Sequence, residues 1–265
     1  MFSKILFIPG ALADLLKVLL HKNISFAERL SIAKALGKLK LASLRARINE
    51  PYTFLLGKNF IHCLYNKNVG FLLKEIFADE VYAVNENAKV KSVLDIGANI
   101  GLSVAYFKMK FPSAKIECYE PDENSFALLQ KNVGANSWKN VKCYKEAVSD
   151  KDGFLYASEV EEMASVNSQF SSDASSKKNK VPSKDIAVIL QQHFDVIKMD
   201  IEGAEWDVFK KIIEEKLITK TNHWFVEFHE IEKNRKEFEE ILHCFKQNGY
   251  KSEERKDVFY FYKNI

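Results

Sequence analysis

The sequence lacks the features that identify several common protein classes. None of its four cysteines forms a Cys-x-x-Cys pair or has a histidine at zinc-ligand spacing, so neither a structural zinc site nor a disulfide framework is predicted. The apolar stretch 5–20 contains Pro9, Gly10, Asp14 and Lys17, which makes it too short and too polar for a membrane span or a cleavable signal. These absences favour reduced cysteines and a cytoplasmic protein.

The sequence also lacks a basic stripe with interleaved aromatic residues, the pattern typical of nucleic-acid binding. The net charge of the 265 residues is +3, but residues 1–50 hold nine lysines and arginines against three acidic residues, so the remainder is net negative. The basic excess could favour acidic lipid or a phosphorylated substrate, although scattered, solvated lysines are the simpler explanation. No nucleic-acid partner is predicted.

Residues 1–84 are predicted to form a helical and hairpin extension. A leucine stripe over 12–20 and capping-box spacing at 25–28 indicate two helices. A β-hairpin over 51–65 and a helix over 71–77 follow. The two helices could cap the domain that follows, form the interface of a homo-oligomer, or contact a membrane surface.

Residues 85–265 alternate between strands and helices, which predicts an α/β domain with a mostly parallel sheet covered on both faces. After a last helix over 232–248, two strands are predicted to close the sheet as an antiparallel hairpin. The segment 151–183 interrupts the alternation with a possible ribbon and a polar tract, and we interpret it as a lid over a substrate. Seven strands are predicted: 93–96, 115–119, 141–145, 194–199, 223–228, 250–254 and 258–262.

A glycine-rich turn follows the first of these strands. Gly97 and Gly101 allow the backbone to turn tightly and approach a ligand, and Asp95 precedes the turn. Asn99 stands where a dinucleotide fingerprint carries another glycine, so the turn suits a ligand with a cationic amino-acid end better than a pyrophosphate. Glu120 ends the next strand, where an acid can accept hydrogen bonds from two ribose hydroxyls. Together they favour S-adenosylmethionine over a nicotinamide cofactor, with an ordinary strand-to-helix turn and a surface glutamate as the alternative.

Polar residues follow five of the predicted strands. Because the carboxyl ends of parallel strands meet at one edge of an open sheet, these residues are predicted to form one site. They occur at 95–101, Glu120, 146–147, 200–202 and 227–229.

Five segments together resemble the FkbM-type methyltransferase family, over a region from about residue 70 to 230. The resemblance implies a class I methyltransferase fold, which is Rossmann-like with a seven-stranded, mostly parallel sheet. It also implies S-adenosylmethionine as cofactor and methyl transfer mostly to hydroxyl groups, often of sugars or polyketides. The Lys-x-Asp-x-Glu-Gly-Ala-Glu stretch is the most specific part. The segments are Val93–Gly101, Tyr119–Pro121, Glu146–Val148, Ile197–Glu205 and Val226–His229.

Each group of predicted cofactor residues has an expected role. Alignment of the acceptor with the activated methyl group could supply roughly 7–11 kcal/mol of the barrier, so the cofactor must be held firmly. We expect Asp95, Gly97, Asn99 and Gly101 to hold its methionine end, Glu120 its ribose, and Glu146 and Ala147 its adenine edge.

An alkyl hydroxyl is a poor nucleophile at neutral pH, so a base should raise the rate by about two to four orders of magnitude. The candidates are Asp200, Glu202, Glu227 and His229, and we expect Asp200 and His229 to serve the acceptor hydroxyl. In simpler interpretations, Asp200 caps the helix that begins near Gly203, and His229 is an exposed loop residue.

Lys198 lies within an apolar strand, where an unpaired ammonium group would be costly. We therefore predict a buried ion pair between Lys198 and Glu227 of the next strand. Glu205 is interpreted as an acid of a first helical turn, stabilised by the helix dipole. The four catalytic candidates could also bind a divalent cation. The Asp-Asn ligand pair of catechol-type methyltransferases is not recognisable, however, and no metal site is predicted.

The sequence thus predicts an S-adenosylmethionine-dependent O-methyltransferase that acts on a hydroxyl of a sugar, a glycan or another small metabolite. One alternative is an N-methyltransferase for an amine or protein acceptor, which would need no strong base. A nicotinamide-dependent oxidoreductase is disfavoured by Asn99. A non-catalytic binding module is the last alternative.

Overall fold

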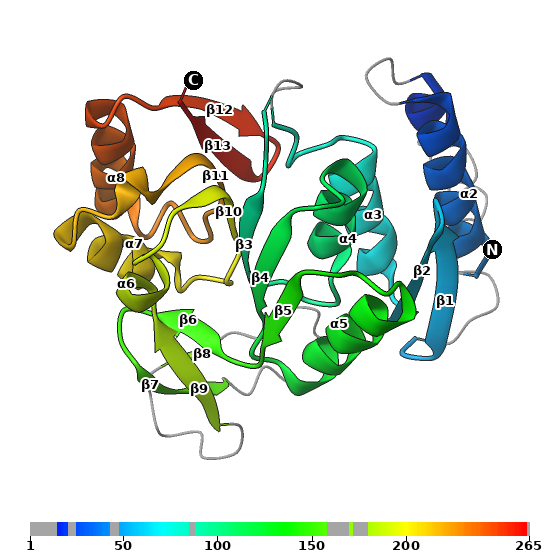
Figure 1. Cartoon of the computed structure of the whole chain (residues 1–265), viewed down its shortest axis with the longest axis horizontal. Helices are drawn as coiled ribbons and strands as arrows, with labels where there is room; N and C mark the ends of the chain where they lie inside the picture. Colours follow the sequence, from blue (N-terminus) through cyan, green and yellow to red (C-terminus); the bar gives the residue numbers. More distant parts are fainter. Residues whose placement is uncertain are drawn as a thin grey trace.

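The computed structural model describes residues 15–20, 25–42, 48–84, 88–157, 170–171 and 180–263 (Figure 1). Much of the predicted lid and the start of the leucine stripe lie outside these described residues. Within the described part of the chain, no helix combines the length and hydrophobicity needed to cross a membrane.

A seven-stranded sheet forms the centre of the molecule, with the strand order β12-β13-β11-β10-β3-β4-β5. The five strands from β11 to β5 pair in parallel, whereas β13 is antiparallel to both of its neighbours. The predicted seven-stranded, mostly parallel sheet with a closing hairpin is therefore confirmed. The strands are β3 (Ser92–Ile96), β4 (Lys115–Tyr119), β5 (Val141–Tyr144), β10 (Phe194–Met199), β11 (Thr221–Glu227), β12 (Lys251–Arg255) and β13 (Val258–Tyr262).

Alternating side chains of these strands build two apolar cores, one on each face of the sheet. Val93 and Val196 belong to the first core, and their neighbours Leu94 and Ile197 belong to the second. Each large apolar side chain contributes about 1.5–3 kcal/mol on burial, so this alternation fixes which helices cover which face. The first core includes α4 (Leu102–Lys110) and α5 (Glu123–Ala135), and the second includes α7 (Glu205–Glu214) and α8 (Arg235–Gln247). Figure 1 shows these two pairs on opposite sides of the sheet.

The N-terminal segment joins the first of these cores. It comprises α2 (Phe26–Ala42), the hairpin of β1 (Pro51–Leu56) and β2 (Asn59–Leu64), and α3 (Lys67–Phe77). Leu36, Phe54 and Leu73 pack in the same apolar cluster as Phe107 of α4. The predicted hairpin and third helix are present, but α3 begins earlier than expected because Asn66 caps it by accepting a hydrogen bond from the Val69 amide. The division of the chain at residue 84 stays a prediction.

Asn132 of α5 anchors the hairpin to the main sheet domain. Its amide group donates to the carbonyl of His62 in β2 (3.0 Å) and to the carbonyl of Ile100 in the glycine turn (2.8 Å). Its Oδ1 accepts a hydrogen bond from the His62 amide (2.7 Å). One buried side chain thus connects the hairpin to the turn that follows β3.

The segment that interrupts the alternation contributes to a second sheet, at the bottom of Figure 1. Its strand order is β6-β9-β7-β8. The predicted ribbon is present as β7, while β9 has no counterpart in the sequence prediction. The role of a lid stays a prediction, since residues 158–169 and 172–179 lie outside the described part. The strands are β6 (Ala147–Ser149), β7 (Gly153–Ala157), β8 (Phe170–Ser171) and β9 (Lys180–Asp185), and the short helix α6 (Ile186–Ile189) follows.

Candidate active site

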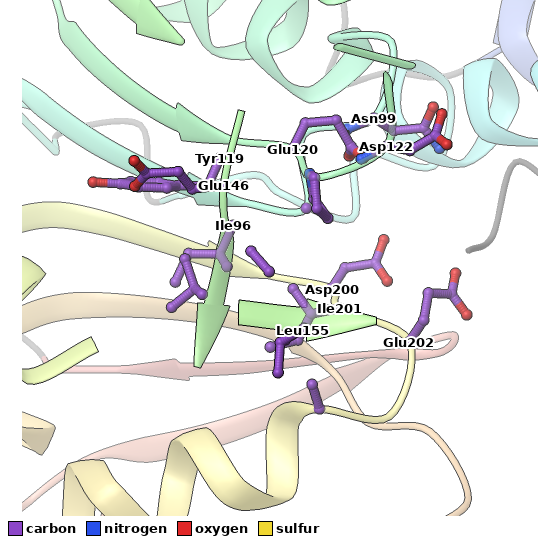
Figure 2. Close-up of a pocket in the computed structure, with 15 residues that line it drawn as sticks. Ile96, Asn99, Tyr119, Glu120, Asp122, Glu146, Leu155, Asp200, Ile201 and Glu202 are labelled. Atoms are coloured by element: carbon purple, nitrogen blue, oxygen red, sulfur yellow. The ribbon is translucent and has the colours of Figure 1, made fainter. Parts of the chain in front are cut away.

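A pocket opens at the carboxyl ends of β3, β4 and β10, with one wall from β6 and β7. It encloses about 620 Å³, its open mouth included. In Figure 2, Glu120 lies beside Asn99 and Asp122, while Asp200 and Glu202 project from the loop after β10. The structure therefore brings predicted cofactor residues and predicted catalytic residues to one cavity. Of the predicted residues, Gly97, Asn99, Glu120, Glu146, Ala147, Asp200 and Glu202 line it.

Gly97 is required by a close approach between two loops. Its φ is +80°, and a Cβ at this position would lie 1.8 Å from the backbone oxygen of Asp200. Gly101, with a φ of +88°, is restricted by a side chain instead, because its Cβ would lie 2.7 Å from Cδ1 of Leu129. The first glycine therefore lets the loops after β3 and β10 meet beneath the pocket.

Glu120 is held by the backbone of two loops. Its Oε2 accepts a hydrogen bond from the Asn99 amide and its Oε1 accepts one from the Asp122 amide, each at 2.8 Å. Asn99 adopts the left-handed conformation (φ 49°) that directs its amide toward this carboxylate. Burial raises the pKa of Glu120 to about 7, while these two hydrogen bonds favour the ionised form. The side chain is thus fixed before any ligand is present.

Asp95 and Gly101 occupy supporting positions rather than the pocket lining. Asp95 is fully buried beneath the turn, where Ser103 Oγ donates to its Oδ2 (2.5 Å). Gly101 is the N-cap of α4. Their direct contact with a cofactor stays a prediction, whereas their effect on the turn is visible in the structure.

Lys198 forms its ion pairs with different residues from the predicted one. Its ammonium group lies 3.5 Å from Asp95 Oδ1 and 3.6 Å from Asp200 Oδ2, and it donates to the Gly97 carbonyl (2.6 Å). Burial alone would lower the pKa of Lys198, but the charges of Asp200 and Asp95 raise it above its ordinary value. The ammonium group therefore stays charged and holds both loops.

The predicted pair of Lys198 and Glu227 is wrong, and strand register gives the reason. Lys198 is paired with Asp95 on β3 and with Phe225 on β11. Glu227 lies two residues beyond Phe225, at the end of its strand. Between these two described residues the structure has no ion pair, so Glu227 is available to other groups at the rim.

Three predicted catalytic residues meet around His229. Its Nε2 lies 3.4 Å from Glu202 Oε2 and 3.7 Å from Glu227 Oε1. Suitable oxygen and nitrogen atoms of Asp200, Glu227 and His229 all lie within 4.8 Å of one another. The alternative in which His229 is an isolated loop residue does not describe this arrangement. The four catalytic candidates thus form one cluster, although Glu227 and His229 lie beside the pocket rather than in its lining.

Mutual repulsion and burial perturb this cluster. Burial, followed by the charge of Asp200, raises the pKa of Glu227 to about 8 and that of Glu202 to about 7. Burial opposes the charged form of His229, but its hydrogen bond to Glu205 and the surrounding carboxylates raise its pKa to about 9. The cluster therefore combines two carboxyl groups and an imidazole whose pKa values are all raised, and perturbed pKa values are common at functional sites.

Glu205 has a larger role than the sequence indicates. It is fully buried, and its carboxylate accepts hydrogen bonds from the amides of Ile201 (3.0 Å) and Gly203 (2.9 Å). His229 Nδ1 lies 3.0 Å from Glu205 Oε1. This acid at the start of α7 therefore fixes both the loop after β10 and the orientation of the imidazole. Its place in the most specific motif of the sequence was the available signal.

Apolar pocket residues were also missed by the sequence prediction. Tyr119 stacks on Tyr144 with ring centroids 4.7 Å apart, and it lines the pocket near Glu146. Leu155 of β7 and Ile201 also line the cavity and lie nearer to Asp200 in Figure 2. In a single sequence such residues cannot be distinguished from core residues, because both kinds are apolar and lie in strands or next to them.

Comparison with known proteins is consistent with this geometry. Residues 95–252 match the family model of the methyltransferase FkbM domain. "Methyltransferase 1" of Beauveria bassiana (strain ARSEF 2860) is 26% identical over 182 residues, which cover 59% of this chain and 69% of that protein. "Methyltransferase sdnD" of Sordaria araneosa is 27% identical over 188 residues, covering 58% of this chain and 70% of that protein.

A solved structure of methyltransferase FkbM from Methylobacillus flagellatus KT is similar over 96% of this chain, with 15% identity and a TM-score of 0.49. The chain spans 58% of the length of that protein. The match to the family model covers more than half of the present chain. The chain therefore belongs to the FkbM family of methyltransferases.

Proposed function

We propose that this methyltransferase moves the methyl group of S-adenosylmethionine to a hydroxyl of a sugar, a glycan or another small metabolite. One observation carries the proposal: a buried, backbone-held carboxylate and a cluster of acids with an imidazole occur at the same rim of the sheet. Family membership supports methyl transfer. Four free cysteines support the reducing environment of the cytoplasm for this enzyme.

The cofactor would occupy the part of the pocket between the loops after β3 and β4. The remaining lone pairs of the Glu120 carboxylate would accept hydrogen bonds from the two ribose hydroxyls. Gly97 and Asn99 would border the methionine end, and Glu146 and Ala147 the adenine edge. This orientation would place the sulfonium methyl group toward Asp200 and Glu202.

The acceptor hydroxyl would lie between this methyl group and the acidic cluster. Its oxygen forms a bond to the methyl carbon while the carbon–sulfur bond breaks and leaves its electron pair on sulfur. The proton of the hydroxyl passes to a base, for which Asp200, Glu202, Glu227 and His229 are the candidates. The products are a methyl ether and S-adenosylhomocysteine.

The test uses S-adenosylmethionine with a ¹³C-labelled methyl group and a panel of sugars, glycans, simple alcohols and amines. Carbon NMR of the products distinguishes an O-methyl from an N-methyl group, and release of S-adenosylhomocysteine reports turnover. We expect O-methyl products. N-methyl products alone would refute the proposed acceptor class, as would binding of the cofactor without any turnover across the panel.

An N-methyltransferase remains the second candidate because the cluster is acidic. Asp200, Glu202 and Glu227 would attract a protonated amine as well as they would accept a proton from a hydroxyl. Once the bound ammonium group has lost a proton to a neighbouring carboxylate or to water, the neutral amine needs no strong base at the moment of transfer, so variants of His229 would keep most of their turnover in that case. The same panel therefore separates the two functions.

A further inference from the structure

We propose that Asp200, Glu227 and His229 bind a divalent cation of the Mn²⁺ type. The three side chains come from the ends of two neighbouring parallel strands, β10 and β11, and offer two carboxylate oxygens and one imidazole nitrogen. This mixed set of ligands suits a first-row divalent metal ion. Binding at this position is a property of the apo protein, whereas its catalytic consequence rests on the proposed function.

The spacing of the three groups is close to that of a coordination sphere. One atom from each residue lies within 4.8 Å of the other two. Ligands about 2.1 Å from a shared ion lie roughly 3 Å apart when adjacent in an octahedron. The three side chains are 22–29% exposed, so small rotations can bring their atoms together.

A buried partner orients the imidazole as a ligand. His229 Nδ1 is engaged by Glu205, whose carboxylate is itself held by the amides of Ile201 and Gly203. The other ring nitrogen, Nε2, faces the carboxylates of Glu202 and Glu227. Metal-binding histidines commonly have this pairing of the remote nitrogen with a carboxylate, which fixes the tautomer and the direction of the ligand lone pair.

Glu75 of α3 is a second observation that points to a cation among these acids. Its side chain is buried, with 6% of the residue exposed, and among the described residues its Oε1 has no hydrogen-bond partner. Its charge interacts with those of Asp200 and Glu227. Lys256 also acts on Glu75 but forms an ion pair with Asp79. Burial raises the pKa of Glu75 and so disfavours its ionised form, which a cation among these acids would stabilise.

A cation held here would have a direct use in the proposed methyl transfer. Three protein ligands leave coordination positions for the oxygen of the acceptor, whose proton then becomes more acidic. Glu202 lies beside His229 Nε2 but outside the three ligands, so it can take that proton. As in the proposed methyl transfer, the acceptor oxygen forms a bond to the methyl carbon while the carbon–sulfur bond breaks.

The test is titration of the full chain with Mn²⁺, followed by electron paramagnetic resonance, with and without S-adenosylhomocysteine. We expect one Mn²⁺ site whose spin-echo modulation shows a coordinated ¹⁴N nucleus. The variants E227Q and H229A should each weaken binding at least tenfold. H229A should also remove the ¹⁴N signal. E232Q, which removes an exposed charge from the same loop, serves as the matched control and should bind like the wild type.

Several results would overturn the cation site. These are no Mn²⁺ binding, binding without a ¹⁴N signal, and binding that is equal in E227Q, H229A and E232Q. Thermal unfolding of each variant and titration with S-adenosylhomocysteine in a chelator show that fold and cofactor site are intact. Methyl transfer in the chelator without Mn²⁺ binding would refute the cation site and leave the proposed function standing. If Mn²⁺ binds as expected but no methyl group is transferred to any acceptor, the cation site stands and the proposed function is refuted.

Discussion

The two sides of the pocket are built by different means. Around Glu120, backbone amides from two loops satisfy the functional carboxylate before a ligand arrives. Around His229, charged side chains from the end of β11 and from the loops after β10 and β11 face one another. The first side is fixed by the path of the chain, and the second by ion pairs between side chains. The comparison indicates that the Glu120 side is preformed by the backbone, whereas the His229 side is a charged cluster held by its own side chains.

The largest effect is expected from Gly97→Ala on the preformed side. The added Cβ would meet the backbone oxygen of Asp200, and the φ of +80° is unfavourable for alanine. We expect a loss of more than about 4 kcal/mol in the free energy of unfolding and no binding of S-adenosylhomocysteine. Urea unfolding and calorimetric titration measure both. Gly134→Ala in α5, where a Cβ has open space, is the control and should be neutral or stabilising by up to about 1 kcal/mol.

A change on the charged side should instead affect the chemical step. For His229→Ala we expect kcat to fall at least about 100-fold, because the cluster loses the group that links its carboxylates. Affinity for S-adenosylhomocysteine should stay near that of the wild type. His243→Ala, an exposed position on α8, is the matched control. Unchanged kcat in His229→Ala would contradict a catalytic role of the cluster and favour an amine acceptor.

Glu120→Gln tests the preformed side through the pH dependence of the affinity for S-adenosylhomocysteine. With a pKa of about 7, the wild-type carboxyl group becomes protonated as the pH falls below neutrality and then loses acceptor capacity for the ribose hydroxyls. We expect affinity for S-adenosylhomocysteine to decrease from pH 8 to pH 6 in the wild type. The variant should bind about tenfold more weakly at pH 8, because it loses a charge-assisted hydrogen bond, and without this pH dependence.

Calorimetry across this pH range gives both quantities. The exposed Glu123→Gln is the control and should keep the wild-type profile. A wild-type affinity that is independent of pH would show that Glu120 does not contact the cofactor in its ionised form.

The smallest effect concerns Glu75 on the charged side. Burial raises the pKa of Glu75 above its ordinary value, so its folded form holds a proton more tightly than the unfolded chain does. Stability should therefore fall as the pH rises from the pKa of Glu75 in the unfolded chain to its raised pKa in the folded protein. The loss should persist at neutral pH. Glu75→Gln removes this cost and should raise the free energy of unfolding at pH 8 by about 1 kcal/mol. Urea unfolding at pH 5 and pH 8 tests the sign, and a destabilised variant at pH 8 would contradict it.

The sequence predicts the sheet and seven of the fifteen residues that line the pocket, because both follow from local patterns. Apolar runs mark the strands, and polar residues at their ends identify the rim where Glu120 and Asp200 meet. What it misses depends on contacts between distant segments. The partners of Lys198 are set by strand register, which no single strand encodes.

The sequence prediction also misses the role of Glu75 and the strand β9, and both have physical causes. The charge of Glu75 acts on Asp200 and Glu227 only because α3 packs on the sheet domain, so this interaction is invisible in the sequence. The strand β9 contains Pro182, which lacks an amide donor and argues against a strand in any local interpretation. Its pairing with β6 and β7 depends on tertiary structure.

The double attachment of Asn132 makes the hairpin a structural support of the glycine turn after β3. If the chain were shortened to begin after β2, the side chain of Asn132 would lose both hydrogen bonds to His62 while it still faced Ile100. A buried amide left with unmet donors and acceptors tends to rearrange or admit water. The loop that carries Asn99 would then be less firmly held, so removal of a hairpin outside the pocket would loosen the backbone that positions Glu120.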